Sequence, residues 1–90
     1  MKKEAVLPSE LTVTLRPLRL RQGEEFDERV ADGKRKEASM HAILDALNNA
    51  GSNISMEELR EFEIPDIAEL FRLVCEITGI DTTGEAKADR

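Results

Sequence analysis

Residues 36–50, KEASMHAILDALNNA, carry the clearest helical pattern in this chain of 90 residues. The large apolar side chains Met40, Ile43, Leu44 and Leu47 recur at spacings of three, four and seven, which places them on one face of an α-helix. Alanines beside this face leave room for another helix, and a glycine follows directly, where many helices end. The stretch therefore predicts a helix with one buried side.

Shorter helical patterns lie on both sides of this segment. Phe26 and Val30 stand four residues apart among charged residues, which predicts a helix over residues 20–31. A Ser-x-x-Glu capping box at residues 55–58 predicts a short helix that begins at Met56. This second helix has to end before the proline at position 65, because a residue that precedes proline disfavours the helical conformation.

The last apolar stripe follows Pro65, at positions 67, 70, 71, 74 and 77. The spacing predicts a helix that runs to residue 78, with Gly79 as a left-handed cap and Ile80 folded back onto the last turn. Asp66 and Glu69 repeat the capping-box spacing, which predicts a second box at the start of this helix.

The N-terminal part has a different period. Leu11, Val13 and Leu15 alternate with polar residues, as in a strand with one buried face. Pro17 interrupts this alternation, and residues 18–21 either resume the strand or begin the next helix. We expect a mainly α fold, a small bundle of three to four helices with a short N-terminal β-strand or hairpin. Residues 11–80 form its single domain, residues 1–10 a flexible arm and residues 81–90 a disordered tail.

Composition limits the protein to one small domain with a modest core. The chain is 40% hydrophobic and 36% charged, and it lacks Trp and Tyr. A chain of this length buries roughly 60–65% of its unfolded surface, so its stability is marginal or shared with a partner, and a homo-oligomer is one such assembly. No apolar run suits a signal peptide or a membrane span, and there is a single cysteine. We therefore expect no membrane partner and a cytoplasmic location.

Charge argues against nucleic acid as a partner. The chain has 13 basic and 19 acidic residues, a net charge of −6, which opposes binding to phosphate backbones. Residues 1–36 hold nine basic against seven acidic residues, whereas residues 37–90 hold four against twelve. Solvated acidic helix faces are the preferred interpretation of this imbalance, and a polarity that orients a partner is the alternative.

No set of residues predicts catalysis, a metal site or a cofactor. His41 and Asp45 share a helix face, but Ser39 points about 200° away from His41, so the three do not form a triad. Cys75 comes late in its helix and has no neighbouring Lys or His to activate it. The acidic residues within positions 57–63 lack the loop spacing and turn glycine of a calcium-binding loop.

Two features suggest protein binding. Arg16, Arg19 and Arg21 continue a basic alternation, which could pair with the chain's own acidic helices, the preferred interpretation, or with an acidic partner. Met40, with the alanines that follow it and Met56 nearby, suits either ordinary core packing, again preferred, or adaptable packing on a foreign helix.

The order of these elements resembles the small tail assembly chaperones of long-tailed bacteriophages. The resemblance covers about residues 11–80 and rests on two segments, Leu-Arg-Pro-Leu-Arg-Leu at 15–20 before a helix and Ile-Pro-Asp-Ile-Ala-Glu-Leu at 64–70 in a late helix. It implies a non-enzymatic protein that coats the tape-measure protein, keeps it soluble and helps to recruit tail-tube subunits. It also implies that a longer, frameshifted form can extend beyond the segment from Asp81.

Such a role requires an exposed apolar groove surrounded by charge. The candidate partner-binding residues, divided between core and groove in a way that periodicity leaves open, are Met40, Leu44, Leu47, Leu70, Phe71 and Val74. The alternative function is that of a small acidic regulatory protein, such as an anti-repressor, an antitoxin-like protein or a nucleic-acid mimic, which blocks a basic partner.

Overall fold

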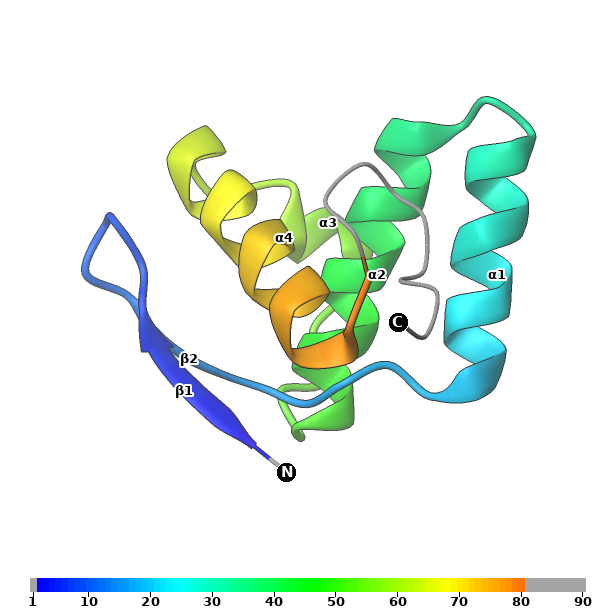
Figure 1. Cartoon of the computed structure of the whole chain (residues 1–90). Helices are drawn as coiled ribbons and strands as arrows, with labels where there is room; N and C mark the ends of the chain where they lie inside the picture. The colour runs from blue at the N-terminus through cyan, green and yellow to red at the C-terminus, as the bar shows by residue number, and fades with distance from the viewer. Residues whose placement is uncertain (1, 81–90) are drawn as a thin grey trace.

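The computed structural model describes residues 2–80. Its elements, shown in Figure 1, are β1 (Lys3–Val6), β2 (Thr12–Leu15), α1 (Leu20–Ala31), α2 (Arg35–Asn49), α3 (Met56–Leu59) and α4 (Ile64–Thr78). The expected fold class is confirmed, because the described part of the chain is mainly helical and starts with a short two-stranded hairpin. The expectation for residues 81–90 lies outside the described residues.

Helix α2 is the element around which the others assemble. It contacts α1, α3, α4 and β2, and α1 and α4 lie on either side of it in Figure 1. Its buried residues, Ala38, Ala42, Ile43, Ala46 and Leu47, combine small side chains with two large ones. The alanines let neighbouring elements approach the α2 backbone, and the large residues fill the space between them.

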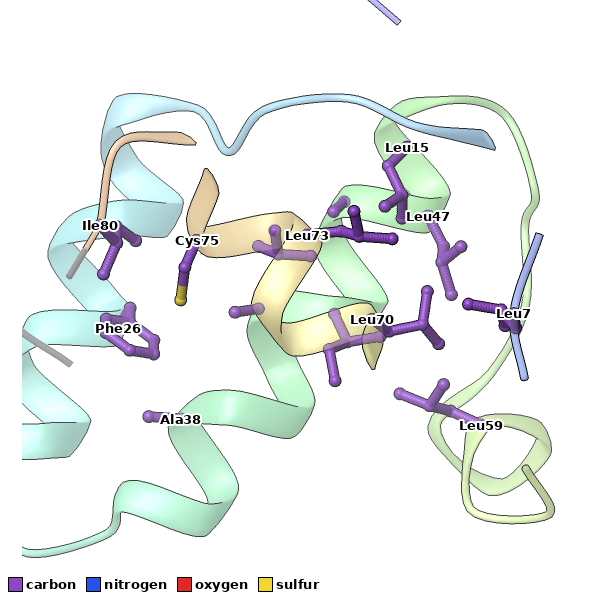
Figure 2. Close-up of a cluster of buried hydrophobic side chains, with 14 residues drawn as sticks. Leu7, Leu15, Phe26, Ala38, Leu47, Leu59, Leu70, Leu73, Cys75 and Ile80 are labelled. Carbon is purple, nitrogen blue, oxygen red and sulfur yellow. The ribbon is translucent and has the colours of Figure 1, made fainter. Parts of the chain in front are cut away.

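The core extends along the facing sides of α2 and α4, the two longest of the described helices. Figure 2 shows Phe26, Cys75 and Ile80 at one end of it and Leu7 and Leu59 at the other. Buried residues come from each of the four described helices and from β2, and the buried Leu7 directly follows β1. One continuous core therefore holds residues 2–80 together.

The hairpin is tied to this core by hydrogen bonds as well as by packing. Its antiparallel register runs from Lys3 opposite Leu15 to Val6 opposite Thr12. Past the end of β2, the Arg16 N–H donates to the Ala46 carbonyl of α2 at 3.1 Å. The structure thus corrects the expected flexible arm, since residues 3–6 of that segment form β1 and pair with the predicted strand.

The helix boundaries agree closely with the sequence patterns. Helix α1 spans Leu20–Ala31 as expected, so the chain after Pro17 does not resume the strand. Gly79 adopts φ 90° at the end of α4, and the Ile80 N–H donates to the Cys75 carbonyl at 2.9 Å, as in a Schellman cap. The predicted fold-back of Ile80 is confirmed, because its side chain is buried.

One predicted cap is wrong. Helix α4 begins at Ile64, one residue before Pro65, and no side-chain cap precedes it. Asp66 does not form a box with Glu69 but accepts hydrogen bonds from Ser9, in the loop between the strands. A partner 57 residues away in sequence is invisible to a local spacing rule, and here it replaces the local interaction.

Candidate functional site

An apolar groove opens between the N-terminal halves of α2 and α4, with α3 and the segment after it at its side. It has a volume of about 690 Å³, within the usual range of ligand pockets of roughly 300–1,000 Å³. Its apolar lining consists of Met40, Met56, Phe62, Ile64 and Ile67. Its polar lining consists of Lys36, Glu37, His41 and Arg60. We call this surface the Met40 groove.

Helix α3 positions Met56 at the groove. The capping box predicted from the sequence is present, because the Glu58 N–H donates to the Ser55 hydroxyl at 3.1 Å and the Ser55 N–H donates to the Glu58 carboxylate at 2.8 Å. Leu59, at the last position of α3, is fully buried and anchors this single turn to the core. The turn is therefore fixed at both ends although it is only four residues long.

The start of α4 exposes a large apolar side chain. Ile64 is 84% exposed, whereas Leu70 on the same helix is fully buried. Asp66, which is 2% exposed, accepts a hydrogen bond from the Ser9 N–H at 3.0 Å and another from the Ser9 hydroxyl. These bonds attach the strand loop to the first turn of α4, the turn that places Ile64 and Ile67 at the groove.

A second, more acidic depression adjoins the groove. It has a volume of about 440 Å³ and is lined by Ser9, Glu10, Leu11, Glu61, Phe62, Glu63 and Asp66. We call it the acidic hollow. Phe62 lines both surfaces, so they lie next to each other. No Lys, Arg or His is among the residues that line the hollow.

The structure divides the six candidate binding residues into core and surface. Leu47, Leu70 and Val74 are buried and belong to the core. Leu44 and Phe71 are half-buried and pack against it, and the ring of Phe71 lies 6.2 Å from that of Phe26 in α1. Of the six, Met40 lines the groove.

Sequence reasoning missed most of the groove. Phe62, Ile64 and Ile67 are large apolar residues that flank a proline among acidic residues. This pattern is the one feature of the sequence that indicates an exposed apolar surface here. A helical stripe places them on an apolar face, but it does not say which part of that face another element covers. The sequence places Met56 near Met40, and both side chains line the groove.

The His41 and Asp45 pair lies partly buried near α1. Burial raises the pKa of the Asp45 carboxyl above its ordinary value of 3.8. His41 and Arg29 lower it in part, and Glu25 raises it further. The residues described here contain no cluster of three or more His, Cys, Asp or Glu side chains arranged to hold a metal ion.

The basic residues after β2 do not pair with the acidic helices as expected. Arg16, Arg19 and Arg21 are exposed, and within residues 2–80 the salt bridge found joins Glu69 and Arg72, both on α4, at 2.6 Å. The hydrogen bond from Arg72 lowers the pKa of Glu69 and raises that of Arg72.

No protein-family model matches this chain, and no curated protein or solved structure matches it significantly. None of the described helices is both long and apolar enough to cross a bilayer.

Proposed function

We propose that this protein is a non-enzymatic binding module that holds an apolar helical segment of another protein in the Met40 groove. The observation that carries the proposal is the groove itself, in which five large apolar side chains meet at the surface. Methionine side chains are flexible and polarisable, so Met40 and Met56 suit an apolar surface that has to fit more than one segment. An amphipathic helix presents apolar side chains at spacings of three, four and seven residues, which suits such a groove.

Residues 81–90 do not suit the groove as its occupant. Residues 81–90 read DTTGEAKADR and contain no large apolar side chain. A polar segment of this kind gains little by entering an apolar groove. Residues 81–90 are therefore not the proposed occupant, and the proposal commits to a helix of another protein, as the resemblance to tail assembly chaperones implies.

In this proposal the client is the tape-measure protein of a phage tail, and the module keeps it soluble in the cytoplasm of the bacterial host. A tape-measure protein is long and helical, so it offers many apolar stripes of this kind. Recruitment of tail-tube subunits would then use other parts of the module or the extension beyond residue 81.

The test is co-expression with the longest helical protein encoded beside this one in its genome, followed by affinity purification in about 0.3 M salt, which screens surface charge beyond roughly 6 Å. The long protein should become soluble and co-purify. Ile64→Asp should abolish co-purification while circular dichroism stays unchanged, because Ile64 is exposed.

Leu20→Asp is the matched control. Leu20 is 79% exposed at the start of α1 and lies outside the groove, so the same change of charge and size should leave binding intact. Equal loss in both variants, or a long protein that stays insoluble while the module elutes folded and alone, would contradict the proposal.

The acidic regulatory protein is the second candidate, and the acidic hollow together with the net charge of −6 favours it. Such a protein would bind a basic partner through charge alone. Its binding should therefore collapse between low and moderate ionic strength, whereas capture of an apolar client should persist.

A further inference from the structure

The Met40 groove and the acidic hollow make up one surface. Phe62 lines both, so a ligand that leaves the groove past Phe62 enters the hollow. Four large apolar side chains of the described chain are strongly exposed: Val6, Leu11, Leu20 and Ile64. Ile64 lines the groove and Leu11 lines the hollow, so two of the four belong to this surface.

Charge differs between the two parts of this surface. Four carboxylates line the hollow without a basic residue, and Asp66 is already bonded to Ser9. Glu10, Glu61 and Glu63 are exposed and left to meet a partner. In the groove, Lys36 and Arg60 outnumber Glu37. A ligand that complements both parts has basic groups at one end and acidic groups along the other.

An α-helix has a natural direction for such a charge pattern. Acidic side chains stabilise its N-terminal turn and basic side chains its C-terminal turn, because of the peptide dipoles. A helix with this pattern matches the surface when its C-terminal end lies over the hollow and its apolar stripe lies in the groove.

We propose that the groove and the hollow together bind an amphipathic helix in one direction, with basic residues of its C-terminal turn over Glu61 and Glu63 and acidic residues beside Lys36 and Arg60. This inference rests on the proposed function and adds the charge pattern and the polarity of the client segment. A tape-measure helix that carries this pattern would be preferred over one with an equal apolar stripe and the opposite pattern.

A second copy of the chain fits this surface less well. Outside it, the strongly exposed large apolar residues of the described chain are Val6 on β1 and Leu20 at the start of α1. They lie on different elements and form no helical stripe that could fill the groove. A helix from another protein is therefore the occupant that the surface favours.

Three synthetic helical peptides with the same apolar stripe test the inference. The first has acidic residues in its N-terminal half and basic residues in its C-terminal half, the second has the reverse, and the third has glutamine at all these positions. By calorimetry at about 0.05 M salt, the first should bind at least about tenfold more tightly than the second. The difference should shrink at about 0.3 M salt.

Because the helicity of a peptide does not depend on the protein variant, a comparison of protein variants isolates the effect of the charged contacts. In E61K/E63K the preference for the first peptide should disappear or reverse. In the control E24K/E28K, which changes two exposed glutamates of α1 in the same way, the preference should persist. If circular dichroism shows that E61K/E63K does not fold, E61Q/E63Q takes its place and should reduce the preference at least threefold.

The outcomes separate the inference from the function on which it rests. If all three peptides bind with equal affinity to the native protein, or if E61K/E63K and E24K/E28K change the preference alike, the charge pattern is wrong and the apolar groove stands. If no peptide binds at millimolar concentration, both the inference and the proposed function are overturned.

Discussion

The two ends of the α2–α4 pair differ in what covers them. Towards the C-terminal end of α2, Ala46 and Leu47 are buried, and the chain after β2 bonds to the helix backbone. Towards its N-terminal end, Met40 and His41 are half-buried and line the groove. At the covered end the chain after β2 lies against α2, whereas at the other end the single turn of α3 and the strand loop leave the groove open. The apolar surface is exposed where the chain provides too little structure to cover it.

The same contrast holds along α4 alone. Ile64 and Ile67 line the groove at its start, and Leu70, Leu73 and Val74 are buried further on. One helix therefore contributes to stability with one part and offers a binding surface with another. Mutations along it should separate the two roles.

The largest expected effect is on stability at the covered part. Leu70→Ala removes a fully buried side chain and should lower the free energy of unfolding by about 2–5 kcal/mol. Ile64→Ala, on the same helix, should change it by less than about 0.5 kcal/mol. Urea unfolding followed by circular dichroism measures both. Similar losses in the two variants would refute the division of α4 into core and surface.

A smaller effect is expected where the strand loop is attached to the open end. Ser9→Ala removes the hydroxyl that donates to buried Asp66 and should cost about 1–3 kcal/mol, because the carboxylate loses one of its two partners. Ser39→Ala is the control, since its hydroxyl donates to the Arg35 carbonyl on the surface of α2. If unfolding in urea shows equal stability for both variants, the Ser9 contact does not hold this end together.

The smallest effect concerns Asp45, on the part of α2 near α1. The folded protein holds the Asp45 proton more tightly than the unfolded chain does, because burial raises the pKa of its carboxyl. Stability therefore falls as pH rises through the interval between the unfolded value and the raised folded value, and the loss persists at neutral pH. Asp45→Asn should then stabilise the protein at pH 7 by less than about 1 kcal/mol, since solvent screens a half-exposed group.

Thermal unfolding at pH 7 and at about pH 3 measures this difference. The stabilisation should be present at pH 7 and absent at pH 3, where Asp45 is protonated in both states. Asp27→Asn on α1, which changes an exposed carboxyl, is the matched control. A native protein that is more stable than Asp45→Asn at pH 7 would mean that His41 and Arg29 outweigh burial.

Local patterns predicted much of the fold. The bounds of α1, the start of α3, and the Gly79 cap with Ile80 folded back all follow from neighbouring residues, because the interactions that set them span only a few positions. The cap at Asp66 was wrong for the opposite reason, since its partner, Ser9, is distant in sequence.

The candidate site was predicted less well than the fold. The sequence alone determined which residues form the apolar faces of the helices, and Met40, Leu47 and Leu70 all lie on such faces. Only the tertiary structure decided that Leu47 and Leu70 are buried and that Met40 is half-buried and lines the groove. The physical reason is that periodicity depends on the geometry of one helix, whereas burial depends on which other element packs against each part of it.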